Sequence, residues 1–558
     1  MTDRKATAPD PPARIPAILN DPVRNRGVAF SAEERAGLGL TGRLPSAVLT
    51  LDEQAERAYV QVRSAPAGIT RKVCLEQLRD RNETLYFKVL SEHPAELLPV
   101  VADPVPGEAI GQCTQEFYIP NGIYLSIDRP GDIEGSFASL GLGADDVDVI
   151  VCSDAAEIPG IGDRGVGGIQ IAAGKVAAYT AAAGIRPGRL IPVSLDVGTD
   201  NQALRSDPLY LGNRHARRRG RDYDAFIRRY VETVSRLFPG ALLHFGAFGP
   251  ENARKILQAY GRGYRVFGED VQGTGTMVLA AVYAGIRVSG IPMKHQTVVV
   301  FGAGATGVAI ADQLHDAIVA DGATDEQARS QIWLVGRQGL LFDDMDDLRE
   351  FQKGYARKRS DSPWASWPAP VGLTETIGEA APTILLGTSA VEGAFTRQVI
   401  EAMCQATRRP LVMTVSGSPS TAEATPSDVM TWSDARALVG AGSAVSPAGY
   451  DGSTFTIAQA NSLLVAPGLG LGVIVSRASR VTPHMLRGAA AAIAEQADAS
   501  QPGTPLLPAP RNLRASSAMV AEAVVPAAVT DGVAAHYPTN LTRAIQDAMW
   551  LPAYPDIG

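Results

Sequence analysis

Three glycines that follow an apolar run are the first residues with a recognisable chemistry. Val298–Phe301 reads as a strand, and Gly302, Gly304 and Gly307 separate it from a segment with apolar residues at helical spacing. In such a strand–turn–helix unit, the glycines let the backbone approach a pyrophosphate, and the helix N-terminus favours its negative charge. The sequence therefore predicts a nicotinamide dinucleotide site formed by Gly302, Gly304, Ala305, Thr306 and Gly307.

The end of the next expected strand bears on which dinucleotide binds. A carboxylate there would accept hydrogen bonds from the adenosine ribose, but the sequence has Gly336 followed by Arg337. A guanidinium can pair with a 2′-phosphate, which favours NADP. If Arg337 instead points into solvent, this argument for NADP disappears, so the choice between NAD and NADP stays open.

The composition is that of a large globular chain. It has 558 residues, of which 45% are hydrophobic and 20% are charged, so two or more domains with substantial cores are expected. The formal net charge of −8 disfavours a general attraction to nucleic acid or to anionic lipid. The arginine-rich loop at residues 215–221 is a local exception. Because no aromatic residues interleave with its arginines, we expect a solvated or subunit-contacting loop there.

Cysteine usage and hydropathy exclude further classes. The four cysteines lack C-x-x-C spacing, which argues against a disulfide scaffold and against a zinc site. The polar, proline-rich N-terminus lacks the apolar run of a signal peptide, and residues 463–475 are too short and too rich in glycine to span a membrane. These features predict a cytoplasmic protein with a small-molecule ligand and with no membrane or nucleic-acid partner.

Strands alternate with helices along most of the chain, which is typical of α/β proteins with parallel sheets. The first strands are expected at residues 147–152, 190–195 and 242–245, and helices at 171–183 and 223–238. A second series of strands is spaced like a doubly wound domain, at residues 297–301, 331–335, 383–386, 410–415 and 437–440. We expect a mostly helical N-terminal region (1–118), a parallel-sheet substrate domain (119–272 plus 462–535), a Rossmann-type dinucleotide-binding domain (273–461) and a C-terminal tail (536–558).

Segments distributed over the chain resemble the malic enzyme family. They include L-N-D-P-V-R-N-R-G-V-A-F at residues 19–30, L-D-V-G-T-D-N at 195–201, D-P-L-Y-L-G at 207–212 and D-V-Q-G-T at 270–274. The resemblance extends roughly from residue 18 to residue 535. It implies an enzyme that oxidises malate with NAD or NADP, decarboxylates bound oxaloacetate and protonates the enolate with the help of Mg²⁺ or Mn²⁺. It also implies a homodimer or homotetramer.

The resemblance assigns roles to several polar residues. It matches the family's general base to Lys175 and a metal-ligating carboxylate to Asp270, with Glu269 beside it. These three are the predicted catalytic residues. The residues expected in the substrate pocket are Glu157, Asn461 and Ser462.

The chain departs from the family at the metal and at the proton donor. Gly246 and Ala247 replace the family's Glu-Asp metal pair, which leaves Asp270 as the matching ligand. Residues 102–107 (A-D-P-V-P-G) lack the tyrosine that opens the corresponding family motif. Because Mg²⁺ and Mn²⁺ bind through several oxygen ligands, a protein-held metal is disfavoured, and decarboxylation is expected to suffer more than hydride transfer.

A change of charge in the substrate pocket leads to three hypotheses. Glu157 stands where the family has the arginine that pairs with a malate carboxylate, so a diacid would be repelled and a cationic or amine-bearing group attracted. The leading hypothesis is an NAD(P)-dependent oxidoreductase acting on a hydroxy or amino compound other than malate, with Lys175 as base. One alternative is a catalytically silent homologue that binds the dinucleotide as a scaffold or regulator. The other is a malic enzyme, converting malate to pyruvate and CO₂, whose catalytic residues are displaced in the sequence.

Overall fold

The chain forms two compact units. The computed structural model describes residues 15–102, 122–158, 161–367, 370–416, 419–443, 445–498 and 505–557. Unit 1 is Met1–Pro120 together with Leu551–Gly558, and unit 2 is Asn121–Trp550. Within the described ranges, no helix is both long and apolar enough to cross a bilayer.

Unit 1 consists of helices, of which α1, α2 and α4 begin with side-chain caps. Ser31 and Thr50 each accept a hydrogen bond from the backbone N–H three residues on, and the carboxylates of Glu34 and Glu53 accept one from the backbone N–H of the cap residue, so α1 and α2 begin with capping boxes. The expected helical N-terminal region is confirmed. Its helices are α1 (Ala32–Gly37), α2 (Leu51–Ser64), α3 (Ile69–Arg81), α4 (Glu83–Glu92) and α5 (Pro94–Ala102).

Residues from the far end of the sequence complete unit 1. The Tyr554 hydroxyl accepts hydrogen bonds from the side-chain amides of Gln54 (3.2 Å) and Asn82 (3.0 Å). The guanidinium of Arg26 donates to the carbonyl of Pro555. Gln54 and Asn82 are both buried, so Tyr554 provides a hydrogen-bond acceptor for two buried side chains of this unit, while the segment 551–557 itself lies at its surface.

Unit 2 begins with a five-stranded parallel sheet of strand order β1-β3-β2-β4-β5. Every residue of β2, β3 and β4 is buried, as expected for strands covered on both faces. The strands are β1 (Ile123–Ser126), β2 (Val149–Ser153), β3 (Leu190–Asp196), β4 (Leu242–Phe245) and β5 (Val266–Gly268). The accompanying helices are α7 (Ile133–Ala138), α8 (Ile169–Ala183), α9 (Gln202–Ser206), α10 (Arg221–Leu237) and α11 (Pro250–Tyr260).

A one-turn π-helix, η6 (Glu269–Gly273), follows β5 and leads into α12 (Thr274–Ser289). A seven-stranded sheet comes next, of order β14-β11-β10-β9-β6-β7-β8, in which only β8 is antiparallel to its neighbour. Its strands are β6 (Val298–Phe301), β7 (Ile332–Gly336), β8 (Gly339–Leu340), β9 (Ile384–Gly387), β10 (Leu411–Thr414), β11 (Leu438–Ala441) and β14 (Ala458–Gln459). The expected doubly wound domain is confirmed.

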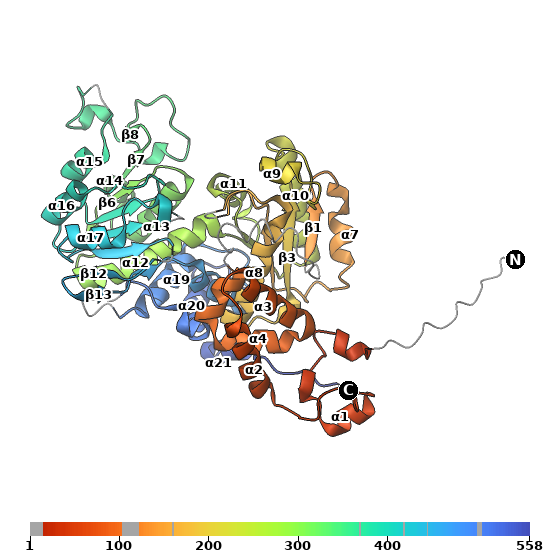
Figure 1. Cartoon of the computed structure of the whole chain (residues 1–558). Helices are drawn as coiled ribbons and strands as arrows, with labels where there is room; N and C mark the ends of the chain where they lie inside the picture. The colour runs from red at the N-terminus through yellow and green to blue at the C-terminus, as the bar shows by residue number, and fades with distance from the viewer. Residues whose placement is uncertain are drawn as a thin grey trace. The chain divides into compact units, whose positions relative to one another are not determined.

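Helices surround the second sheet, and further helices form the C-terminal part of unit 2 (Figure 1). Those among its strands are α13 (Ala305–Ala320), α14 (Asp325–Ser330), α15 (Leu373–Ala380), α16 (Arg397–Ala406) and α17 (Pro426–Trp432). A two-stranded hairpin, β12 (Ala448–Tyr450) and β13 (Ser453–Phe455), precedes β14. The chain ends with α18 (Ala466–Ser476), α19 (Pro483–Glu495), α20 (Leu513–Thr530) and α21 (Leu541–Ala548). Of these, α18 and α20 pack against each other and against α8.

Candidate functional site

The glycine-rich turn between β6 and α13 has the geometry of a phosphate-binding loop. Gly302 has a φ of 120°, which a side chain would strain, and an added Cβ at Gly307 would lie 2.0 Å from the Gly302 carbonyl oxygen. Gly304 begins α13 without a side-chain cap, so the first N–H groups of the helix stay available for a ligand. The turn therefore presents backbone donors and a helix N-terminus to an anionic group.

A cavity of about 650 Å³ opens against this turn. One wall is formed by Gly304, Ala305 and Thr306, and the facing residues include Glu157, Phe248 and Lys255. Its volume is in the range of cavities that hold cofactor-sized and drug-sized ligands. The cavity thus joins the predicted dinucleotide residues to the predicted pocket residue Glu157.

Glu157 is an exposed carboxylate that forms no ion pair with any residue the structure describes. Its backbone N–H donates to the carbonyl of Ala247 at 3.4 Å, and its Oε2 would lie 2.9 Å from a Cβ added to Gly249. The carboxylate is therefore at the cavity wall without an ion-pair partner among the described residues, in a lining that also contains Arg217, Arg218, Arg219, Lys255 and Arg349. A ligand that carries a positive charge would compensate the Glu157 carboxylate.

Lys175, Glu269 and Ser462, which are far apart in the sequence, meet in one buried cluster. Lys175 Nζ lies 2.5 Å from Glu269 Oε2, and the Ser462 hydroxyl donates to Glu269 Oε1. Burial by itself would raise the pKa of Glu269, but the Lys175 ammonium and the His244 imidazole hold that pKa well below its usual range. Glu269 is therefore an ionised carboxylate that fixes the tip of Lys175.

Asp270, the next residue, is held by the backbone. Its Oδ1 accepts the N–H of Ala247 at 3.0 Å, and its Oδ2 accepts the N–H of Phe248 at 2.8 Å. Burial and the neighbouring charge of Glu269 raise the pKa of Asp270 to about 7. Ala247 has a φ of 60°, so Asp270 braces a left-handed turn directly beside the cavity residue Phe248.

The donor set around Asp270 does not fit Mg²⁺ or Mn²⁺. Gly246 and Ala247 offer no side-chain ligand, and both Asp270 oxygens already accept backbone hydrogen bonds. Glu269 is engaged by a positively charged ammonium, which would repel a divalent cation. Across the described ranges, no group of three or more His, Cys, Asp or Glu side chains is arranged to hold a metal ion. These hard cations need several free oxygen ligands, and the cluster does not supply them.

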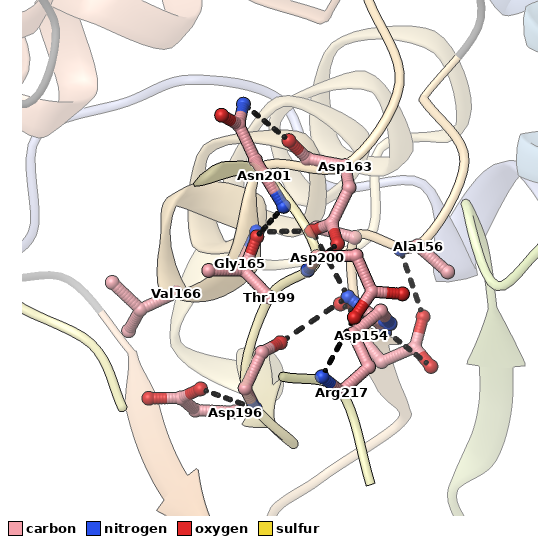
Figure 2. Close-up of polar contacts among 12 residues, drawn as sticks. Asp154, Ala156, Asp163, Gly165, Val166, Asp196, Thr199, Asp200, Asn201 and Arg217 are labelled. Atoms are coloured by element: carbon pink, nitrogen blue, oxygen red, sulfur yellow. Dashed lines mark hydrogen bonds and ion pairs between the residues drawn. The ribbon is translucent and has the colours of Figure 1, made fainter. Parts of the chain in front are cut away.

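A second polar network joins Asp154, Asp163 and Arg217 (Figure 2), and Asp163 and Arg217 also line the cavity. The Arg217 guanidinium pairs with Asp154 at 2.9 Å and with Asp163 at 3.1 Å, and the Tyr223 hydroxyl donates to Asp154 at 2.9 Å. Asp154 is fully buried and Arg217 nearly so. For Arg217, the expectation of a solvated loop was wrong, because this arginine neutralises a carboxylate buried behind the cavity.

Among the predicted residues, only Glu157, Gly304, Ala305 and Thr306 line the cavity. The others do not line it: Lys175, Glu269, Asp270, Asn461, Ser462, Gly302, Gly307 and Arg337. Asn461 uses its side-chain oxygen to accept the N–H of Leu463 at 2.9 Å and so caps the short helix in which Ser462 lies. Arg337 is exposed just after β7. Ala102 ends α5 in unit 1, and residues 103–107 of the altered tyrosine motif lie outside the described residues.

Six residues of the two networks were missed by the sequence-based predictions: His244, Tyr179, whose hydroxyl oxygen lies 2.9 Å from His244 Nδ1, and Asp154, Asp163, Arg217 and Tyr223. His244 stands alone as a polar residue inside the apolar strand β4, which was an available signal, because an unpartnered polar residue is rarely buried. Tyr179 lies four residues after Lys175 and shares its helix face, a weaker signal. Nothing in the spacing of Arg217 indicated that it pairs with Asp154, which precedes it by 63 residues.

Known proteins match the chain over nearly its whole length. Two family models fit it: the malic enzyme N-terminal domain at residues 79–261 and the malic enzyme NAD binding domain at residues 271–529. A Mycobacterium tuberculosis protein provisionally named malate oxidoreductase (NAD) is 58% identical, with 97% of this chain and 98% of that protein covered. NAD-dependent malic enzyme 3 of Bacillus subtilis is 45% identical (97% and 96% covered). The malolactic enzyme of Lactiplantibacillus plantarum is 40% identical (96% and 98% covered).

Solved structures share the fold at much lower identity. The malic enzyme of Entamoeba histolytica superposes with a TM-score of 0.54 at 19% identity, covering 92% of this chain and 91% of that chain. The malic enzyme of Pyrococcus horikoshii Ot3 gives a TM-score of 0.53 at 20% identity, covering 76% and 86%. At this identity the likeness establishes the architecture and leaves the chemistry to the site residues.

Proposed function

The chain belongs to the malic enzyme family, and from that premise we propose that it is an NAD-dependent oxidoreductase that acts on a small hydroxy or amino compound other than malate. The observation that carries this proposal is the cavity with the glycine-rich turn on one wall and the unpaired Glu157 carboxylate on another. NAD is favoured over NADP by the name of the Bacillus subtilis relative, which is 45% identical to this chain.

The glycine-rich turn would hold the dinucleotide. Gly304, Ala305 and Thr306 offer backbone N–H groups to the pyrophosphate, and the bound NAD would supply the hydride acceptor. Exposed Arg337 is free to reach a 2′-phosphate, so binding of NADPH remains part of the test.

We assign Lys175 the role of the general base that accepts a proton from the substrate. Lys175 would act as the base after giving one proton to solvent: its neutral Nζ would accept the O–H or N–H proton of the substrate, while the hydride of the C–H would pass to bound NAD. Ionised Glu269, whose Oε2 lies 2.5 Å from Nζ, would stabilise the ammonium that forms. The substrate is oxidised, and the nearby ion pair holds the released proton. No divalent cation is used, because the donor set around Asp270 does not suit one.

Glu157 is assigned to substrate selection. Its carboxylate lies on the cavity wall without an ion-pair partner among the described residues, so it would favour a substrate that brings an ammonium or amine group next to it over a small dicarboxylate. Glu157→Gln should therefore raise the KM for an amine-bearing substrate roughly tenfold with a smaller effect on kcat, because it removes one charge-assisted contact.

The test is an assay of NADH formation with a panel of hydroxy and amino compounds, each with EDTA or with Mn²⁺. We expect oxidation of an amine-bearing member that is unaffected by EDTA. Lys175→Ala should lower kcat about 10²- to 10⁴-fold while the Kd for NADH, followed by fluorescence, stays unchanged. Manganese-dependent conversion of L-malate to pyruvate as the dominant reaction would contradict the proposal.

A catalytically silent homologue is the second candidate. The closed Lys175–Glu269 ion pair and the absence of a fitting metal donor set among the described residues favour it. It predicts tight NADH binding with no turnover of any panel member, and no effect of Lys175→Ala.

A malic enzyme with displaced catalytic residues is the third candidate, favoured by the names of the relatives. Light scattering of the purified protein would test the proposed homodimer or homotetramer.

A further inference from the structure

A buried chain of hydrogen bonds extends from Lys175 into the core of unit 2. Glu269 Oε2, which lies 2.5 Å from Lys175 Nζ, also lies 2.7 Å from His244 Nε2, and His244 Nδ1 lies 2.9 Å from the Tyr179 hydroxyl oxygen. Lys175 and Tyr179 are four residues apart on α8, so both ends of the chain start from one helix face. The chain links α8 to β4 and to the π-helix η6.

The protons of this chain can be arranged in one way. Ionised Glu269 only accepts hydrogen bonds, so His244 must donate to it from Nε2. Nδ1 of the neutral imidazole is then an acceptor, and the Tyr179 hydroxyl donates to it. Each donor in the chain therefore points toward Glu269, and His244 and Lys175 both contact the same carboxylate oxygen, Oε2.

Packing leaves His244 and Tyr179 no room to turn. Each side chain is about 1% exposed, and the two rings meet edge to face at 5.7 Å. The other edge contact of His244 is with Phe267 at 5.1 Å. The Tyr179 ring lies against the backbone of Gly470 on α18, where an added Cβ would come within 2.6 Å of Cε1. The two rings therefore form a rigid support.

The space in front of Glu269 is kept open by a glycine. A Cβ at Gly246 would lie 3.1 Å from Glu269 Oε2 and 3.1 Å from Lys175 Cε. Gly246 does not have a positive φ, so a side chain is disfavoured there by the ion pair itself and not by the backbone. The missing side chain at 246 and the long side chain at 269 thus complement each other.

We propose that His244 and Tyr179 are positioning residues that hold the Lys175–Glu269 pair in place, and that Gly246 is required to accommodate the pair. This inference rests on the proposed role of Lys175 at the proton-transfer step. It assigns no contact with substrate to either ring. A misplacement of Lys175 by about 1 Å would lower turnover by up to about 10²-fold.

The direct test measures the chemical reactivity of Lys175. Reductive methylation with formaldehyde, followed by peptide mass spectrometry, gives the rate for Lys175 relative to Lys255, which is exposed in the same unit. In the wild type we expect Lys175 to react about tenfold more slowly, because Glu269 holds its ammonium. His244→Leu should remove most of this difference, and His244→Gln, which keeps a donor toward Glu269, should preserve it. Equal ratios in wild type, His244→Leu and His244→Gln would overturn the proposal.

Milder variants guard against a failure of His244→Leu to fold. Tyr179→Phe removes only the hydroxyl, and Gly246→Ala adds only a methyl group at the ion pair. Both should raise the Lys175 methylation ratio about two- to fivefold. Gly240→Ala is the matched control, because a Cβ there meets nothing within 4 Å. If Gly246→Ala behaves like Gly240→Ala, the requirement for glycine at 246 is wrong.

The readout separates this inference from the proposed function. An absence of turnover with every substrate would contradict the proposed function, while the methylation ratios would still report on the support of Lys175. If a substrate is found, His244→Leu should lower kcat with little change in KM, whereas a purely structural role would change thermal stability and leave the Lys175 ratio as in the wild type. A change in thermal stability with an unchanged Lys175 ratio would refute the positioning role and leave the proposed function standing.

Discussion

At the scale of single residues, Asp270 has an unusual carboxylate because burial opposes its charge. Its pKa of about 7 in the folded protein exceeds the ordinary value near 3.8, so between roughly pH 4 and pH 7 the folded state holds a proton that the unfolded state has lost. The contribution of Asp270 to the free energy of unfolding is therefore largest at low pH and is lost as the pH rises through this window.

Asp270→Asn should remove that pH dependence. Urea unfolding at pH 5, 6, 7 and 8 should give a flatter slope for the variant, with the wild type losing on the order of a few kcal/mol more across the window. The variant will also be less stable throughout, because an amide can accept only one of the two N–H groups of Ala247 and Phe248. Asp132→Asn, at an exposed position, serves as the control. Identical slopes for wild type and Asp270→Asn would disprove the assignment.

The sequence predicted part of this residue chemistry. The resemblance to the malic enzyme family singled out Lys175, Glu269 and Asp270; Lys175 and Glu269 are in contact, and the catalytic role of all three stays a prediction. The partners of Glu269 could not be found in this way, since His244 and Ser462 reach it across 25 and 193 positions of the sequence. Tertiary packing decides such contacts. Within the arginine-rich loop only Arg217 was misjudged, because its buried partner Asp154 is far away in the sequence, whereas Arg218, Arg219 and Arg221 are exposed as expected.

At the scale of elements, the turn between β6 and α13 depends on close packing at Gly307. An added Cβ there would lie 2.0 Å from the Gly302 carbonyl oxygen and 2.8 Å from Thr388 Oγ1. Gly307→Ala should therefore push α13 away from β6 and weaken NADH binding at least tenfold. Gly378→Ala is the matched control, because it lies in α15, meets nothing within 4 Å and gains helix propensity of about 0.5–1 kcal/mol. Fluorescence titration with NADH measures both, and equal affinities would contradict the role of Gly307.

Periodicity predicted the central strands of the five-stranded sheet and missed its two edge strands. β2, β3 and β4 appear in the sequence as continuous apolar runs of the kind expected for parallel strands. β1 and β5, the two edge strands, were missed: β5 has only three residues, and β1, although as long as β4, is not a continuous buried run. The π-helix η6 also has no sequence signature, although it carries Glu269 and Asp270.

At the scale of the whole molecule, unit 1 depends on a segment from the other end of the chain. Tyr554→Phe removes an acceptor shared by Gln54 and Asn82, which should cost about 1–2 kcal/mol because two buried amides lose a partner. Hydrogen–deuterium exchange should rise in peptides from α2 and α4. Tyr537→Phe, at an exposed tyrosine of unit 2, should not change it. If exchange in α2 and α4 is the same in both variants, residues 551–558 do not stabilise unit 1.

The position of Tyr554 also determines the order in which the protein matures on the ribosome. About 450 residues separate α5 from the segment that completes unit 1. At about 5–20 residues per second, the nascent helices of unit 1 wait roughly 20–90 s for Tyr554 to be synthesised. During that interval Gln54 and Asn82 lack their partner, so unit 1 is the part of the newly made chain that is open longest to chaperones and proteases.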